Sequence, residues 1–308
     1  MKRLVPLIAF ALLASSAQAA QGGPFTVMET GKSYARLRDA VLDMRGSTAT
    51  IVVAPGTYRD CAVHQGGFLT IRAAEPGTVI FDGGTCEDKA TLVLRGNGAR
   101  IEGLIFQNLR VPDGNGAGIR LEMGPLEVVN SIFRNSQEGI LTGNDPNADI
   151  TVRQSTFSGL GGCPESGCSH AIYAGEYRRL IVENCRFERG TGGHYVKSRA
   201  AGIRVANSSF DDTQGRASNY MIDLPGGATG TIAGNMFVQG ANKENYSAMI
   251  VVAAEGRVHS AAGLTIADND ARLGAGARGT TFIVDFTHEP LRISGNRLGA
   301  GIKPFETR

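Results

Sequence analysis

The chain lacks tryptophan, and only 19% of its 308 residues are charged. So little charge excludes the charge-rich pattern of a coiled coil. Glycine is abundant: it makes up 42 of the 308 residues, about twice its usual share of roughly 7%. It does not recur at every third position, which excludes a collagen. Apolar residues make up 42% of the chain and occur throughout, which excludes a disordered protein. The composition indicates a chain that turns often and still buries a core.

Apolar runs long enough to cross a bilayer are also missing. The run at residues 4–13 follows two basic residues and is shorter than the roughly 20 residues that a spanning helix needs. Small residues then lead to Ala19, so residues 1–19 are predicted to be a secretory signal peptide, cut after Ala19, and residues 20–308 the mature chain. A membrane anchor is the alternative that this length disfavours. We expect a periplasmic or secreted protein.

Neither sign of charge is in excess once the leader is removed. Without Lys2 and Arg3, 29 basic residues face 29 acidic ones. Nucleic acid is therefore not an expected partner, because phosphate binding needs a clustered positive field. Aspartate-rich bends such as Asp211-Asp212 do not give full calcium-ligand spacing, and the glycine-rich segments lack a dinucleotide-binding context. We predict no metal and no cofactor, although calcium was considered, and we expect a monomer.

Five cysteines acquire a meaning from export. In an oxidising compartment they are disulfide candidates first and metal ligands second. Cys163 and Cys168 close a short loop, and zinc, the alternative, would need further ligands at comparable spacing. Cys61 and Cys86 lie 25 residues apart and form the second candidate pair. Cys185 is then the odd cysteine, expected to be a buried thiol.

A short sequence motif recurs from about residue 100 onward: an alternating apolar stretch, then a polar residue, then a hydrophobic residue. The recurrent polar residues are Asn130, Gln154, Asn184, Asn207, Asn235, Asn269 and Asn296. Their spacing varies between 23 and 34 residues, which suits coils of constant cross-section joined by loops of variable length. Each unit buries its apolar side only if the next one stacks upon it in parallel.

These features predict an all-β, single-domain right-handed parallel β-helix of about ten coils over residues 50–300. A β-sandwich would need antiparallel hairpins every 8–12 residues, which the sequence lacks. Apolar residues at helical spacing predict an amphipathic helix over residues 33–45 that caps the open N-terminal end. Cys61 and Cys86 would lie one coil apart in this register, which supports a disulfide between them.

This order of elements resembles a known superfamily. A helix, then the residues Ala-Pro-Gly-Thr-Tyr at 54–58, then the asparagine-punctuated coils are similar to the pectate-lyase-like right-handed β-helix proteins, over residues 30–300. Four segments look like those of a group of exported proteobacterial β-helix repeat proteins without a settled activity: 116–120, 169–173, 193–200 and 220–227. The superfamily includes lyases, epimerases, hydrolases and non-catalytic proteins, so the resemblance implies the fold, and the site must indicate the reaction.

Polar residues that face outward on neighbouring coils are where a site can form. With Ile119, Ile140, Ile172 and Val196 as inward equivalents, the outward positions are Arg120, Leu141, Tyr173 and Lys197. The same register places Glu122 and Arg199 one pleat further along, and Asp223 on the next coil. We take as substrate-binding candidates Arg120, Glu122, Tyr195 and Asp223.

This set of side chains suits β-elimination on an acidic, uronate-containing polysaccharide. A cation at the sugar carboxylate acidifies the C5 proton, a base removes it, and an acid protonates the leaving O4. Arg199 and Arg120 are the expected carboxylate binders, Lys197 the base and Tyr173 the acid. Lys197 and Arg199 share one strand, unlike the lysine and arginine on neighbouring coils of some β-helix lyases.

Other interpretations remain open. A C5-epimerase shares the proton abstraction, a glycosidase would pair Asp223 with Glu122 or Asp211, and a non-catalytic glycan-binding or envelope protein would use the same face. His170 and His194 occupy equivalent positions one coil apart and are expected to point inward near a bend. They form either a hydrogen-bonded structural pair, which we favour, or a catalytic pair, or a metal pair.

Overall fold

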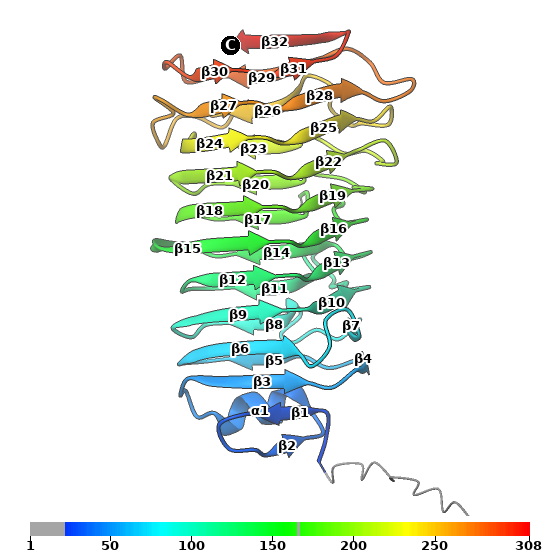
Figure 1. The fold of residues 1–308 in the computed structure, drawn as a ribbon, viewed down its shortest axis with the longest axis vertical. Helices are drawn as coiled ribbons and strands as arrows, with labels where there is room; N and C mark the ends of the chain where they lie inside the picture. Colours follow the sequence, from blue (N-terminus) through cyan, green and yellow to red (C-terminus); the bar gives the residue numbers. More distant parts are fainter. Residues whose placement is uncertain (1–21, 165–166) are drawn as a thin grey trace, which may run out of the picture.

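Three long sheets run along a rod-shaped solenoid (Figure 1). The computed structural model describes residues 22–164 and 167–308, so the expected signal peptide lies outside the described residues. One sheet has twelve strands and the other two have ten each. Each main strand pairs in parallel with its equivalents one coil before and one coil after, which gives about nine full turns. The predicted all-β parallel solenoid is therefore confirmed.

From β3 onward, consecutive strands along the chain belong in turn to the three sheets, which we term A, B and C. Sheet A consists of β2 (Ser33–Tyr34), β1 (Phe25–Val27), β3 (Ala49–Val53), β6 (Phe68–Ala73), β9 (Gly98–Glu102), β12 (Leu126–Val129), β15 (Asp145–Arg153), β18 (Tyr177–Glu183), β21 (Gly202–Ala206), β24 (Thr229–Ala233), β27 (Thr265–Ala267) and β30 (Arg292–Ser294). Sheet B consists of β4 (Gly56–Tyr58), β7 (Val79–Asp82), β10 (Leu104–Gln107), β13 (Ile132–Arg134), β16 (Thr156–Ser158), β19 (Arg186–Glu188), β22 (Ser209–Asp211), β25 (Met236–Gln239), β28 (Asp270–Leu273) and β31 (Arg297–Leu298). Sheet C consists of β5 (Ala62–His64), β8 (Ala90–Leu94), β11 (Ala117–Leu121), β14 (Glu138–Thr142), β17 (Ile172–Ala174), β20 (Val196–Ser198), β23 (Ile222–Leu224), β26 (Ala248–Val252), β29 (Thr280–Asp285) and β32 (Ile302–Thr307).

A short helix, α1 (Leu37–Asp43), lies at the N-terminal end of the solenoid beside β1 and β2 (Figure 1). It buries Leu37, Ala40 and Val41 against the first coil. The helix is shorter than the predicted span of 33–45, because Ser33 and Tyr34 pair with β1 as an antiparallel strand. A strand pairing outside the helix therefore decides where the helix begins.

The bend between sheets A and B contains two polar columns where the sequence analysis expected one. Residues with positive φ form the first column: Asn130, Gln154, Asn184, Asn207, Gly234, Asp268 and Gly295. Asparagine and glycine tolerate this left-handed geometry. The residues that follow form the second column, which is buried except for the half-buried Asn296: Ser131, Ser155, Cys185, Ser208, Asn235, Asn269 and Asn296. In this second column Asn235 donates its side-chain amide to Asn269 at 3.0 Å, and Asn269 donates to Asn296 at 2.9 Å. The predicted single Asn column is thus corrected: its last three members sit one residue later and form a buried amide ladder.

The core holds a continuous stack of phenylalanine rings, one ring per coil. Successive ring centroids lie 4.7–5.6 Å apart along Phe81, Phe106, Phe133, Phe157, Phe187, Phe210 and Phe237. The spacing matches that of neighbouring strands, so the backbone pairing sets the ring stacking. All seven rings are buried.

Both expected disulfides are present, Cys61–Cys86 and Cys163–Cys168. Cys185 is free and buried as predicted, and burial raises the pKa of its thiol to about 11. Within the described parts of the chain, no helix is long and apolar enough to cross a membrane.

Replacing Phe187 by alanine tests the ring stack. The variant removes a buried ring with stacked neighbours on both sides, and we expect it to lower the free energy of unfolding by about 3–5 kcal/mol. The exposed neighbour Arg186, changed to alanine, serves as control and should cost no more than about 1 kcal/mol. Urea unfolding followed by circular dichroism measures both. Equal losses in the two variants would contradict a stack that stabilises the solenoid.

Candidate functional site

The outer surface of sheet C carries the predicted side chains in the predicted register. Backbone pairing aligns Ile119 with Ile140, then Ile172, then Val196. The residue after each of these faces outward, and together with the neighbouring coils they form what we term the outer column: Val93, Arg120, Leu141, Tyr173, Lys197, Asp223 and Val251. Tyr173, Lys197 and Asp223 therefore lie on three consecutive coils.

A second column lies two residues before the inward positions of the same strands. We term it the ring column: Ala90, Ala117, Glu138, His170, His194, Tyr220 and Ala248. The His170 and His194 rings stack with centroids 4.9 Å apart, and the His194 and Tyr220 rings with centroids 5.2 Å apart. His170 also meets the edge of Tyr173 at 5.2 Å, so the two columns touch.

The histidines were expected to point inward, and this expectation is wrong. Just before each strand of this region two consecutive residues lie in the core, as Ala171 and Ile172 do. This break in the alternation of the strand turns the preceding residue to the outer surface. His170 and His194 are nonetheless well covered, with 3% of His170 exposed.

Charged groups converge on the outer column. The Lys197 ammonium lies 3.5 Å from Asp223 Oδ2 and donates to Glu255 Oε1 at 2.7 Å. Arg199 donates through Nε to the Tyr173 hydroxyl at 2.9 Å and through Nη2 to the other oxygen of Glu255. The carboxylate of Glu255, which comes from the loop after β26, is therefore held between an ammonium and a guanidinium. The Glu255 side chain is 47% exposed and reaches the space between these two cations from the solvent side; we term this space the seat.

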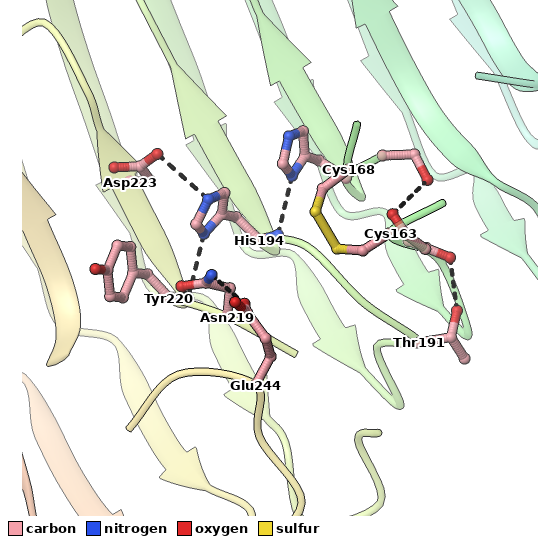
Figure 2. Close-up of a disulfide and its surroundings, with 12 residues drawn as sticks. Cys163, Cys168, Thr191, His194, Asn219, Tyr220, Asp223 and Glu244 are labelled. Carbon is pink, nitrogen blue, oxygen red and sulfur yellow. Dashed lines mark hydrogen bonds and ion pairs between the residues drawn. A yellow bond between two sulfur atoms is a disulfide. The ribbon is translucent and has the colours of Figure 1, made fainter. Parts of the chain in front are cut away.

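His194 connects the ring column to Asp223 (Figure 2). Its Nδ1 accepts a hydrogen bond from the backbone N–H of Tyr220 at 3.2 Å, so in the neutral ring the proton belongs on Nε2. Nε2 lies 3.4 Å from Asp223 Oδ2. Asp223 Oδ2 thus faces His194 and Lys197, while its Oδ1 makes no hydrogen bond to any described residue.

Burial sets the protonation of these groups. It raises the pKa of the Asp223 carboxyl to about 6, and the nearby Lys197 only partly offsets this effect. Burial also lowers the pKa of His170 to about 3 and that of His194 well below its ordinary value, helped by the positive charge of Lys197. Near neutral pH the site therefore combines two neutral imidazoles with a carboxylate that is ionised and still basic.

Glu138 is a further buried acid in the ring column. Only 1% of it is exposed, and neither of its carboxyl oxygens has a hydrogen-bond partner among the described residues. Burial raises its pKa well above the usual range. The Nε of Arg120, on the neighbouring column, is also buried without a partner. Leu141 separates Arg120 from Tyr173 in the outer column, so Arg120 belongs with Glu138 rather than with Lys197.

Two predicted substrate-binding residues lie elsewhere. Glu122 is bound by Lys89 at 2.7 Å and by Arg95, in a separate ion cluster. Tyr195 is 3% exposed and points into the core, where its hydroxyl donates to Asp212 at 2.6 Å, so it does not line the outer surface. Tyr195 immediately precedes the inward Val196, and the same broken alternation that turns the histidines outward turns Tyr195 inward.

The sequence analysis missed Glu138, Tyr220 and Glu255. The first two could have been found, because they precede the inward Ile140 and Ile222 by the same two residues that separate His194 from Val196. Glu255 carried no such signal, since it lies in a loop outside the repeat. Among residues 22–164 and 167–308, no group of three or more His, Cys, Asp or Glu is placed to hold a metal ion.

The model of the family described as "Right handed beta helix region" matches residues 90–271. The chain belongs to the right-handed β-helix family. This match covers more than half of the sequence and includes every residue of the outer and ring columns. The resemblance stated above is confirmed for the fold, and with it the right hand of the solenoid.

Three solved structures are similar to the chain. The PL6-family alginate lyase AlyGC shows 14% identity and a TM-score of 0.40 over 84% of this chain and 38% of that one. ORF18 of Geobacillus virus E2 shows 14% identity and a TM-score of 0.45, over 87% of this chain and 55% of that one. The A-module of the mannuronan C-5 epimerase AlgE4 of Azotobacter vinelandii shows 12% identity and a TM-score of 0.28, over 88% of this chain and 93% of that one. The chain thus spans less than two thirds of the first two, and the likeness concerns the fold alone. No curated protein matches.

The pKa of His170 predicts how stability depends on pH. Because that pKa is about 3 in the folded chain and 6.5 ordinarily, the unfolded chain binds more protons between these values. The free energy of unfolding therefore rises with pH through this window and falls on acidification. His170→Gln keeps an acceptor for the His194 N–H and removes the titration, so its stability should fall less steeply from pH 6.5 to 3.

Urea unfolding at a series of pH values measures both slopes. Asp223, whose raised pKa acts in the opposite direction, is present in both proteins and cancels from the comparison. Parallel curves for the wild type and His170→Gln would show that His170 is not held neutral by burial.

Proposed function

We propose that this protein acts on an acidic, uronate-containing polysaccharide and cleaves it by β-elimination at the outer column of sheet C. The observation that carries the proposal is that Lys197 and Arg199 together form a binding site, the seat, for one carboxylate. A carboxylate already occupies it in the form of Glu255, with one oxygen on each cation. A uronate carboxylate offers the same two oxygens, and guanidinium binds carboxylate in a fork-like geometry.

Each step then has a group in reach of this seat. Lys197 and Arg199 hold the sugar carboxylate and draw charge from C5 as its proton leaves. Asp223, with its pKa of about 6 and with no described hydrogen-bond partner on Oδ1, accepts the C5 proton. The electron pair of the C5–H bond forms the C4–C5 double bond, and the C4–O4 bond breaks. Tyr173, whose hydroxyl is oriented by Arg199, gives its proton to the leaving O4.

This scheme differs from the sequence-based one in the base. Lys197 was predicted to remove the proton, but its ammonium contacts the carboxylates of Asp223 and Glu255. A cation held in this way suits carboxylate binding. His194 then acts as a positioning residue, because it contacts Oδ2 of Asp223 and not Oδ1, the oxygen proposed to accept the proton.

We also propose that the protein is exported to the periplasm or beyond. The two disulfides support this, since such bonds persist in oxidising compartments. An acidic polysaccharide, a polymer of cell envelopes and their surroundings, is then an accessible partner.

Tyr173→Phe tests the reaction. Wild-type protein incubated with polygalacturonate, alginate and hyaluronan should release an unsaturated product from one of them, followed by ultraviolet absorbance. Removal of the proposed acid should lower kcat by about 10²–10⁴-fold with little change in KM. Tyr34→Phe, at the N-terminal end of the chain, is the control and should keep full activity.

The proposed function fails if no polymer yields the unsaturated product. Inversion at C5 without cleavage, seen by NMR of the recovered polymer, would assign the site to an epimerase. Binding without either reaction would assign it to glycan recognition.

Glu255→Gln gives an independent check of the seat. The substrate carboxylate has to displace Glu255, so removal of this charge should lower KM by about tenfold, the equivalent of one charge-assisted hydrogen bond. Glu306→Gln, which removes a paired surface carboxylate at the C-terminal strand, should leave KM unchanged. A raised KM in Glu255→Gln would mean that Glu255 helps to bind the sugar and does not compete with it for Lys197 and Arg199.

A further inference from the structure

A cavity of about 570 Å³ opens on the loops that lead from sheet B to sheet C. Apart from glycines, it is lined by Arg110, Asn135, Arg189, Thr191, Gln214 and Arg216. The three arginines come from three different coils, and none of the described residues that line the cavity is acidic. The loops are those that carry the chain into the ring column.

The positive charge of this cavity has no counter-charge among the described residues that line it. None of the three guanidiniums forms an ion pair with any carboxylate of the residues that the structure describes. Elsewhere on the solenoid, arginines stand between glutamates of adjacent coils, as Arg153 does between Glu127 and Glu183. Arg189 and Arg216 lie on consecutive coils and Arg110 three coils before Arg189. Cations gathered around one cavity in this way create a local field that attracts anions.

The backbone of Arg189 supplies a second observation. Arg189 has a φ of 55°, in the left-handed region that disfavours most side chains. The equivalent bends of preceding coils place there Asn108, Asn135 and Gly159, residue types that tolerate this geometry. The chain therefore places an arginine at a bend where asparagine or glycine would fit with less strain, and it does so at the cavity. Such strain concentrates at functional positions.

The cavity adjoins the proposed catalytic face along the chain. Thr191 precedes His194 by three residues, and Arg216 precedes Tyr220 by four. Lys197 follows Thr191 by six residues, and six residues span at most about 21 Å, a distance that one extended polymer covers.

We propose that this arginine pocket binds the carboxylate of a second acidic sugar in the polysaccharide whose reacting sugar sits on Lys197 and Arg199. The inference rests on the proposed function for the identity of the polymer. The pocket itself selects chains with a carboxylate beyond the reacting unit, and neutral glycans lack the group that it binds.

The test uses hexasaccharides of galacturonate and of mannuronate, with a neutral maltohexaose as comparison, in isothermal titration calorimetry on the full chain. Arg189→Asn removes the charge and introduces a residue that accepts the left-handed bend, so the fold is retained. Arg189→Asn and Arg216→Gln should each weaken binding of a uronate hexasaccharide by about tenfold. Arg292→Gln, an exposed arginine on sheet A, is the matched control and should bind as the wild type does.

Turnover separates this inference from the proposed function. If the wild type cleaves a uronate polymer, Arg189→Asn should raise KM and leave kcat unchanged. If the wild type binds a uronate hexasaccharide without cleaving it, the lyase proposal fails, and weaker binding by Arg189→Asn still supports the pocket. The pocket is overturned if both variants bind as the wild type does, or if the wild type binds no uronate hexasaccharide or binds maltohexaose equally well.

Discussion

Parallel backbone pairing between successive coils is the constraint on which the whole structure depends. Each coil places its equivalent residues about 4.8 Å from those of the next, so the chain builds columns rather than isolated contacts. A side chain that stacks on its own kind gains a partner on both sides, as the phenylalanine rings do. A polar side chain in the wall must find its partner in the same column or the adjacent one, as the amide ladder of Asn235, Asn269 and Asn296 does.

The same constraint explains where the candidate site lies. Both columns of sheet C become apolar toward the two ends of the rod: Ala90, Val93 and Ala117 on one side, Ala248 and Val251 on the other. The coils between them carry acids, imidazoles, a phenol and cations in register. Two coils beyond Val251, the last strand adds Glu306 and Lys303 in the same registers, and these two residues pair with each other. The polar groups of the intervening coils are covered by their stacked neighbours, and burial then shifts the pKa values of Asp223 and His170 in the directions that each environment dictates.

How far the sequence predicts this site follows from the regularity of each segment. The alignment of Ile119, Ile140, Ile172 and Val196 was correct because the alternation within these strands is strict, and it placed Tyr173, Lys197 and Asp223 on one surface. The histidines and Tyr195 were assigned to the wrong sides because two consecutive residues face inward just before the strand. The asparagine column was read one residue out because glycine or aspartate takes over the left-handed bend in the later coils. Glu255 could not be predicted, since its loop has no equivalent in the repeat.

The balance of charge distinguishes the two anion-binding regions. At the outer column, Lys197 and Arg199 are matched by the carboxylates of Asp223 and Glu255, so the unliganded site is neutral. In the proposed function, a uronate takes the place of Glu255 and keeps that balance. The partly buried cations are then never left without a counter-charge, which would be costly. None of the described residues that line the arginine pocket is a carboxylate, and its three arginines are exposed, so their cations are solvated. Under the two proposals, an acidic polymer meets a positive field at the arginine pocket and an exchangeable carboxylate site at the outer column, which favours initial capture at the first and chemistry at the second.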